Sequence, residues 1–423
     1  MTEFLQLSTP TEALGVLLET LPCRAISIET IDTVHSLGRA LAMDIKAPHP
    51  LPEFSRSTVD GYAVQARDTF GASESLPAYL NNIGEVLMGK PPPLRLNSGN
   101  CSLINTGGML PEGANAVVML ENTQRIDIPG QDSKTNAKQA EITIMRPVAE
   151  GENIIRLGED VSADQVVLAA GIRIRPAEIG GLMALGIMTL RVANKPRIGI
   201  ISSGDELIPP VGKTCPGQVR DINSYSLAAL IEEAGGEPVC YGIVPDRLEE
   251  LKAESAKALE ECDALIITAG SSTSARDLTV EAIASLGSPG VLVHGVNLRP
   301  GKPTILAVCN GKAVIGLPGN PVSALVVARR FVIPIIEKLL GLKVARLRTS
   351  VQARLMVNVS SQAGREDWVA VKLVQNGEGF YQAKPVFGKS NLIFSLVAAN
   401  GLMRIPPDAN GVSAGEMVEV ELM

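Results

Sequence analysis

RIGIISSG at residues 197–204 is a short apolar run that ends in small polar residues. Two further runs of this kind follow, PVCYGIV at 238–244 and DALIITAG at 263–270. Between them, residues 224–234 and 247–261 carry apolar side chains at helical spacing. Strands and helices that alternate at this spacing predict βαβ units on a parallel sheet. We therefore assign this part of the chain to the α/β class.

The sequence on either side of this region has other periodicities. Residues 11–21 predict an amphipathic helix that Pro22 stops. Residues 54–126 predict a β-rich unit, and residues 178–187 predict a buried helix. After Arg346 only short alternating strands remain, which predicts a terminal β-barrel or sandwich.

The chain has 423 residues, more than one hydrophobic core supports, and we predict four domains. A polar stretch at 129–140 predicts an exposed hairpin loop in the inserted β-rich domain. The domains are a discontinuous N-terminal α/β domain at 1–50 plus 145–195, an inserted β-rich domain at 51–144, an α/β domain at 196–343 and a C-terminal β domain at 344–423.

The composition excludes several classes of protein. Acidic residues outnumber basic ones by 45 to 38, and only 3% of residues are aromatic, which argues against a nucleic-acid binder. The six cysteines show no metal-ligand spacing, so we expect reduced, buried thiols. We see no signal peptide and no apolar run near the about 20 residues that cross a membrane, and expect a cytoplasmic protein.

Acidic side chains follow the strands of the predicted sheet. Asp205 and Glu206 follow the first strand, Asp246 follows the second and Asp277 the third. Ligands of open parallel sheets bind at the carboxyl ends of the strands, and Mg²⁺ prefers oxygen donors. Each acid alone is better explained as a helix cap or a solvated turn residue. Their coincidence at strand ends favours a Mg²⁺ site.

The loop after the third strand predicts an anion site. Residues 268–274 are rich in Gly, Ser and Thr and lead into a helix that we expect to start near Leu278. Free N–H groups at a helix N-terminus bind anions, although many similar loops bind nothing. The candidate residues are Gly270, Ser271, Ser272 and Arg276.

A second anion candidate is NLRPGKP at 297–303, in which Arg299 and Lys302 bracket a Pro-Gly turn. The stretch Gly295–Lys302 is not a Walker A loop, because it is one residue too long and Pro303 replaces the required Ser or Thr. GxGxxG is absent as well. The sequence therefore supports neither a P-loop NTPase nor a Rossmann NAD enzyme.

GLPGNPVSAL at 316–325 joins a predicted strand to a long helix. We expect Asn320 to cap the helix, Pro321 to take its first position and Pro334 to kink it. The glycines would let a ligand approach the backbone, whereas the alternative is ordinary capping. The candidate ligand-binding residues are Pro318, Gly319, Asn320 and Ser323.

Three turns outside this domain also carry polar groups. Asp60-Gly61 is normally a hairpin signal, and Thr106 precedes two glycines with an available hydroxyl. GENIIRLGED at 151–160 ends in Glu159-Asp160. Taken singly, all three are turns.

Together and in this order, these segments resemble the molybdopterin molybdenumtransferases, the MoeA-type family that includes the gephyrin E domain. The resemblance covers essentially the whole chain and implies the predicted domain order and an elongated homodimer. The segments that carry it are RSTVDGYAV (56–64), TGGMLPEGANAVV (106–118), GENIIRLGED (151–160), SSGDEL (202–207), RPGKPTILA (299–307) and GLPGNPVSAL (316–325).

The resemblance implies the last step of molybdenum cofactor biosynthesis, in which a Mg²⁺-assisted transferase inserts molybdate into adenylylated molybdopterin and releases AMP. The implied catalytic acids are Asp60, Asp160, Glu206, Asp246 and Asp277, and the implied Mg²⁺ ligands are Asp205, Glu206, Asp246 and Asp277. Thr106 matches the family's threonine in the inserted domain, and Ser390 falls in the C-terminal segment that usually has a Gly-Ser turn. The resemblance implies that both bind substrate. Asp60 and Thr106 of one protomer would face the α/β cleft of the other.

Several positions depart from the family pattern. Ile155 and Gly295 stand where basic residues are usual, Arg299 replaces a lysine, and Asn115 replaces an aspartate. The loop after the third strand has Ala269 and Ser274-Ala275 where glycines are common. These changes leave open a tungstate-inserting variant, or a non-catalytic carrier or scaffold paralogue.

A molybdopterin adenylyltransferase is a neighbouring alternative, because its fold resembles residues 196–340. That activity does not need the other domains. We expect such an enzyme instead as a partner that hands over the adenylylated pterin.

Overall fold

The computed structural model describes residues 7–127, 140–269, 273–344, 349–375 and 379–423, without the side chains of 273–277. Its contacts divide the chain into two compact units. The first comprises Met1–Met43, Ala170–Arg175 and Thr189–Met423, and the second comprises Asp44–Ala169 and Pro176–Met188. The second unit therefore interrupts the first at two places.

The first unit contains a six-stranded sheet with the order β16-β13-β17-β21-β20-β18. Its strands β16, β13, β17 and β21 are parallel, as the alternating pattern predicts. Every residue of β17 is buried, as a strand covered on both faces requires. The strands are β13 (Arg197–Ser203), β16 (Glu237–Val244), β17 (Ala264–Ala269), β18 (Pro289–His294), β20 (Ile305–Cys309) and β21 (Lys312–Pro318).

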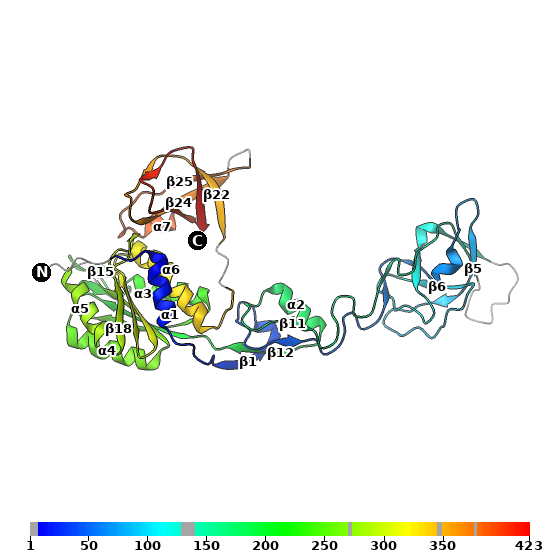
Figure 1. Ribbon diagram of the computed structural model, residues 1–423, viewed down its shortest axis with the longest axis horizontal. Coiled ribbons are helices and arrows are strands. Elements are labelled where there is room, and N and C mark those ends of the chain that lie inside the picture. The colour runs from blue at the N-terminus through cyan, green and yellow to red at the C-terminus, as the bar shows by residue number, and fades with distance from the viewer. Residues whose placement is uncertain (1–6, 128–139, 270–272, 345–348, 376–378) are drawn as a thin grey trace. The chain divides into compact units, whose positions relative to one another are not determined.

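Helices cover both faces of this sheet (Figure 1). On one face, α1, α3 and α6 share a core that includes Ile198, Leu227 and Phe331. On the other face, α4 and α5 enclose Leu251 and Ile267. The helices are α1 (Pro10–Thr20), α3 (Asn223–Ala234), α4 (Leu248–Glu261), α5 (Thr273–Ala284) and α6 (Pro321–Leu339).

Two strands at one edge of the sheet run antiparallel, which differs from the predicted parallel sheet. β20 and β21 form a hairpin around Asn310 and Gly311, whose φ angles are 51° and 75°. Asn-Gly favours such a two-residue turn, because both positions need left-handed backbone. β18 then pairs antiparallel with β20 and ends the sheet.

The C-terminal part of the first unit is a closed five-stranded barrel, which confirms the predicted β-barrel-like fold. The strands pair in the order β24-β25-β22-β28-β26, and β26 pairs back with β24. Ala353, Val371 and Val420 lie in its core. The elements are β22 (Ser350–Leu355), β23 (Val359–Ser360), β24 (Glu366–Gln375), β25 (Tyr381–Pro385), α7 (Phe394–Val397), β26 (Gly401–Ile405), β27 (Gly411–Val412) and β28 (Met417–Leu422).

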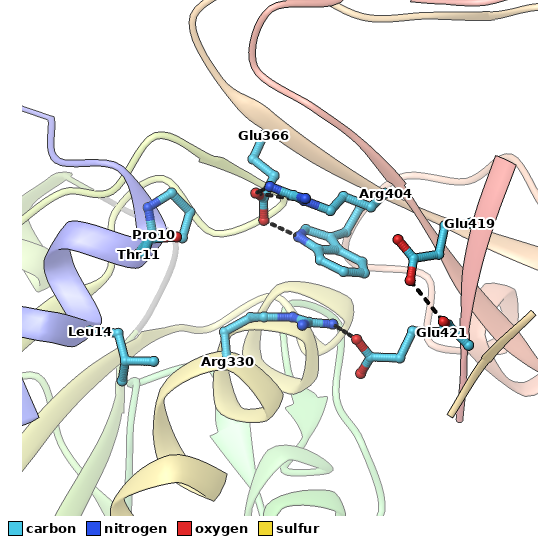
Figure 2. Close-up of a pocket in the computed structure, with 10 residues that line it drawn as sticks. Pro10, Thr11, Leu14, Arg330, Glu366, Arg404, Glu419 and Glu421 are labelled. Carbon is cyan, nitrogen blue, oxygen red and sulfur yellow. Dashed lines mark hydrogen bonds and ion pairs between the residues drawn. The ribbon is translucent and has the colours of Figure 1, made fainter. Parts of the chain in front are cut away.

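The barrel is attached to the α/β domain at the start of β24. The short strand β19 (Leu298–Arg299) pairs parallel with it. From α6, the Arg330 guanidinium lies 3.6 Å from the centre of the Trp368 ring and donates to Glu421. Figure 2 shows Arg330 facing Glu421 across this junction. Since Trp368 Nε1 also donates to Glu366 at 2.7 Å, the buried ring is held by both domains.

Two short ribbons complete the first unit. β1 (Ile28–Asp32) pairs antiparallel with β12 (Thr189–Ala193), and β14 (Leu207–Ile208) pairs parallel with β15 (Val219–Arg220). Both ribbons are short, so the six-stranded sheet and the barrel hold most of the core.

The second unit is β-rich and contains a six-stranded sheet with the order β7-β4-β6-β5-β9-β8. Tyr62, Val118 and Ile142 belong to its core. The elements are β2 (Ile45–Lys46), β3 (Arg56–Ser57), β4 (Gly61–Val64), β5 (Ala78–Glu85), β6 (Asn100–Ile104), β7 (Ala116–Met119), β8 (Thr123–Asp127), β9 (Ala140–Ile144), β10 (Ile154–Ile155), β11 (Val166–Leu168) and α2 (Pro176–Ala184). Almost all of the predicted loop at 129–140 lies outside the described residues.

Asp60-Gly61 does not form a hairpin, so the hairpin expectation was wrong. β3 pairs with β10, whereas β4 pairs with β6 and β7. Gly61 opens β4 beside β7, where an added Cβ would lie 1.9 Å from the Val118 carbonyl oxygen. The glycine is therefore required by close backbone approach rather than by a turn.

The expectation of a buried helix near 178–187 was also wrong. Only Leu182 of α2 is buried. Gly180 and Gly181 provide no side chain to bury, and an added Cβ at either would meet nothing within 4 Å.

The cysteines are free, but only Cys101, Cys262 and Cys309 are buried as expected. Cys23, Cys215 and Cys240 are exposed, which corrects the expectation for half of them. Among the helices of the described residues, none is long and apolar enough to cross a membrane.

Candidate functional site

The acids at the strand ends of the first unit partly come together. Asp205 follows β13 and Asp246 follows β16, and the Asp246 backbone N–H donates to Asp205 Oδ1 at 3.2 Å. Ser203, the last residue of β13, donates its hydroxyl to Asp246 Oδ1 at 2.7 Å. The parallel pairing of β13 and β16 produces this contact, since their carboxyl ends lie at one edge.

Glu206 lies beside this pair but folds back over the end of β13. A Cβ added at Gly204 would lie 2.7 Å from Glu206 Oε2. The oxygen donors of Asp205 and Asp246 fit a hard cation such as Mg²⁺ in kind. Within the described residues, no group of three or more His, Cys, Asp or Glu side chains is placed to hold a metal ion. The side chain of the fourth predicted ligand, Asp277, is outside that part of the chain.

The helix after the third strand begins earlier than predicted. α5 begins at Thr273 rather than near Leu278, so Arg276 and Asp277 belong to its first turns. Gly270, Ser271 and Ser272 lie outside the described residues, as do the side chains of Arg276 and Asp277.

A cleft of about 1030 Å³ lies between the α/β domain and the barrel of the first unit. Its α/β wall is formed by the turn after β19 and by the start of α6, and its barrel wall by the segments around β23, β24 and Ser390. It brings together six predicted residues from two distant segments and the barrel. They are Arg299, Lys302, Pro318, Asn320, Ser323 and Ser390.

The cleft is basic. Arg299 and Lys302 line it from the α/β side, and Arg365 and Lys389 line it from the barrel. Among the described residues that line it, Asp367 is the single carboxylate, and its side chain is only 3% exposed. Four cations around one buried carboxylate make this cleft suitable for a dianion or a phosphate group.

Asn320 is the N-cap residue of α6, as predicted, but its side chain joins the two walls of the cleft. Its Nδ2 donates to the Ser390 hydroxyl at 3.0 Å, and no side-chain cap bond forms at this helix. Val322 N–H donates to the Ser390 carbonyl at 3.1 Å. Pro321 takes the first position of α6 as predicted, and Pro334 lies inside the helix.

Gly319 and Ser323 lie beside this link. Gly319 presents its carbonyl to Asn223 of α3, whose Nδ2 donates to it at 2.8 Å. Ser323 is buried in the first turn of α6. The structure therefore places the predicted segment at the cleft, with the Asn320 side chain bonded to the barrel rather than to the first turn of α6.

Three residues of the cleft were missed from the sequence: Arg365, Asp367 and Lys389. Arg365 and Asp367 flank the start of β24, and the pairing of β24 with β19 brings them to Arg299. The available signal was the charged run GREDW at 364–368, which interrupts an otherwise alternating β pattern.

In the second unit, Asp60 and Thr106 form a pair. Asp60 Oδ1 accepts the Thr106 backbone N–H at 2.7 Å and its hydroxyl at 3.0 Å. These two hydrogen bonds, the backbone one first, lower the pKa of Asp60 below its ordinary value. The Thr106 hydroxyl is therefore engaged by Asp60, and both residues are exposed.

Asp160 is exposed in the second unit, where its N–H donates to the Leu51 carbonyl at 3.0 Å. Among the positions that depart from the family pattern, Asn115 accepts the Ala66 N–H at 2.7 Å. Ile155 pairs with Arg56 between β10 and β3. These contacts give both unusual residues a structural role.

The architecture defines a class: a multidomain α/β protein with an inserted β-rich unit and a basic cleft closed by a C-terminal barrel. Family profiles match the MoeA N-terminal region (domain I and II) at residues 8–186, the probable molybdopterin binding domain at 199–338 and the MoeA C-terminal region (domain IV) at 352–423. The chain belongs to the MoeA family.

Relatives match along nearly the whole chain. The molybdopterin molybdenumtransferase of Nostoc sp. is 32% identical over 93% of this chain and 88% of its own length. The molybdopterin molybdenumtransferase of Bacillus subtilis is 34% identical over 92% and 88%. The crystal structure of a molybdopterin biosynthesis MoeA protein from Pyrococcus horikoshii covers 99% of this chain and 100% of its own, with 32% identity and a TM-score of 0.82.

Proposed function

We propose that this protein inserts molybdate into adenylylated molybdopterin and releases AMP. Membership in the MoeA family supports a role in molybdenum cofactor biosynthesis. The observation that carries the finer proposal is the basic cleft, where Arg299, Lys302, Arg365 and Lys389 line one cavity. A cleft with this charge suits molybdate or a phosphate, and its size admits a pterin-sized ligand.

The charged and the uncharged residues of the cleft would have different roles. Arg299 and Lys302 would neutralise oxyanion charge, which lowers the cost of bringing molybdate next to a phosphorylated substrate. Asn320 and Ser390, with Pro318, Gly319 and Ser323, would seat the pterin or its phosphate. We propose the same for Gly270, Ser271, Ser272 and Arg276.

Mg²⁺ would be held by Asp205, Glu206, Asp246 and Asp277. The contact between Asp205 and Asp246 supports part of this set. The cation would supply charge neutralisation for the phosphates of the nucleotide. Asp60 and Asp160 would act from the second unit.

The direct test is AMP release. The purified protein is incubated with adenylylated molybdopterin, Mg²⁺ and molybdate, and AMP is measured over time. Lys302→Gln should slow release by about a hundredfold, the low end for loss of one charge-stabilising donor. Lys384→Gln, an exposed lysine of β25 outside the cleft, is the matched control and should leave the rate unchanged. Pterin binding without AMP release would contradict the enzyme and favour the carrier or scaffold.

Two further arms separate the remaining alternatives. Tungstate in place of molybdate tests the tungstate-inserting variant. Chelation of Mg²⁺ should stop AMP release if the cation is required, and undiminished release would contradict the proposed Mg²⁺ site.

We also propose a homodimer with a shared site and the four domains predicted above. Mixing an Asp60→Ala chain with an Asp277→Ala chain should restore part of the activity, because one of the hybrid sites would keep both acids. Mixtures as inactive as each variant alone would contradict the shared site.

A further inference from the structure

Asp367 is an acidic residue in a cleft that otherwise carries positive charge. It is buried, and it stands at the start of β24 opposite Arg299 in the register with β19. A carboxylate here repels an anion in the same cleft, so simple charge counting makes it unfavourable for binding. Its contacts provide another explanation.

Asp367 binds two guanidinium groups from the two walls of the cleft. Its Oδ1 accepts Arg365 Nε at 2.9 Å, and its Oδ2 accepts Arg365 Nη2 at 3.4 Å. The same Oδ2 accepts Arg299 Nη1 at 3.4 Å. One carboxylate therefore fixes an arginine of the α/β domain relative to an arginine of the barrel.

The arginines keep donors for a ligand. Arg299 is 60% exposed and Arg365 is 31% exposed, whereas Asp367 is buried behind them. Among the described residues, Nη2 of Arg299 and Nη1 of Arg365 have no protein partner. Two guanidinium forks held in fixed positions match the oxygens of a tetrahedral dianion.

We propose that Asp367 is a positioning residue, which orients Arg299 and Arg365 to bind a tetrahedral oxyanion such as molybdate, tungstate, sulfate or phosphate. This inference rests on the proposed function for the choice of molybdate, but not for the geometry of the pair. A fixed pair loses less conformational freedom on binding than two independent long side chains do, and this offsets the repulsion by the carboxylate.

The direction in which Asp367→Asn changes the affinity for molybdate distinguishes a positioning role from a simple charge effect. Asp367→Asn removes the negative charge, so charge counting predicts tighter binding of molybdate. Positioning predicts weaker binding, with Kd raised about tenfold, the scale on which partners behind a ligand-binding group act. The measurement is calorimetric titration of the full-length protein with sodium molybdate and, separately, with sodium sulfate.

The matched control is Glu366→Gln, one residue away. Glu366 is also buried and also accepts an arginine, Arg404, at 2.7 Å, but it faces the junction drawn in Figure 2 and not the cleft. This variant should bind molybdate like the wild type. Emission of Trp368, the only tryptophan, reports whether the junction stays folded in each variant.

A double-mutant cycle tests whether Asp367 acts through Arg365. In an Arg365→Gln background, Asp367→Asn should change Kd much less than it does in the wild type. An equal effect in both backgrounds, or unchanged or tighter binding by Asp367→Asn alone, overturns the inference. So does a wild type that binds no tetrahedral dianion. If the dianions bind as expected and AMP release fails, the proposed function falls and the positioning role of Asp367 stands.

Discussion

Two hydrogen bonds from Thr106 set the pKa of Asp60. Asp60 is exposed, so desolvation raises its pKa less than the hydrogen bonds from Thr106 lower it. The Thr106 N–H and hydroxyl favour the ionised form, which lowers the pKa of Asp60. Because the pKa of Asp60 is lowered in the folded protein, the pair stabilises the fold at pH values above the ordinary pKa of an aspartate. That stabilisation is lost as the pH falls through the pKa of Asp60 in the folded protein.

Thr106→Val should raise the pKa of Asp60 towards its ordinary value, because the hydroxyl bond is lost and the backbone bond remains. Carboxyl titration by NMR measures this change. Thr123→Val is a suitable control, since that hydroxyl bonds the Leu120 carbonyl instead. An Asp60 pKa that is the same in the wild type and in Thr106→Val would contradict the assignment.

The sequence predicts functional residues that lie within one segment better than residues that are brought together by the pairing of distant segments. Arg299, Lys302 and Asn320 were identified because each stands in a turn beside a recognisable strand or helix. Arg365 joins them only through the pairing of β24 with β19, which local sequence does not encode. The Asn320 bond to Ser390 spans 70 positions and was missed for the same reason.

At the level of elements, Gly61 shows how one missing side chain allows two strands to pack. β4 runs beside β7, and an added Cβ would meet the Val118 carbonyl at 1.9 Å. Backbone atoms cannot move aside as a flexible side chain can, so the strands would have to separate.

Gly61→Ala should therefore destabilise the second unit by about 1 to 3 kcal/mol or more, the cost of overpacking. Urea unfolding measures the change. Gly180→Ala in α2 is the control, because nothing lies within 4 Å of the added Cβ and alanine favours a helix by about 1 kcal/mol. A Gly61→Ala protein as stable as the wild type would show that β4 and β7 can separate around the added Cβ without a measurable loss of stability.

Other elements were predictable in proportion to their local signals. The strands and helices from β13 to β17 follow from apolar periodicity, and the observed bounds agree with the expectation within a few residues. The β20–β21 hairpin has an Asn-Gly turn at 310–311 that could have revealed it. The exposure of α2 could not be predicted, since periodicity reports which residues are apolar and not what covers them.

At the scale of the whole molecule, the first unit depends on the junction between its α/β domain and its barrel. Arg330 lies over Trp368 and also pairs with Glu421, whose side chain is only 10% exposed. Removal of Arg330 would leave the buried Glu421 carboxylate with the longer ion pair to Arg329, at 3.7 Å, which compensates its charge less well. The junction should therefore be sensitive to substitution.

Arg330→Met should destabilise the junction by about 2 kcal/mol, because the Trp368 ring loses its cation and Glu421 loses its shorter ion pair, while Arg329 stays 3.7 Å from it. Urea unfolding followed by Trp368 emission measures this at the junction itself. Arg354→Met, an exposed arginine of β22, should leave the curve unchanged. If both variants unfold like the wild type, the Arg330 contacts do not hold the barrel.

The position of α1 has a consequence for synthesis on the ribosome. Its apolar side packs with α6, and Lys338 of α6 donates to the Leu18 carbonyl of α1. About 300 residues separate the two helices, so at typical translation rates α1 waits roughly 15 to 60 seconds for its partner. During that time Leu17 and its apolar neighbours are open to chaperones. The two segments of the second unit end at Met188, long before α6 is synthesised. The second unit can therefore fold before the first.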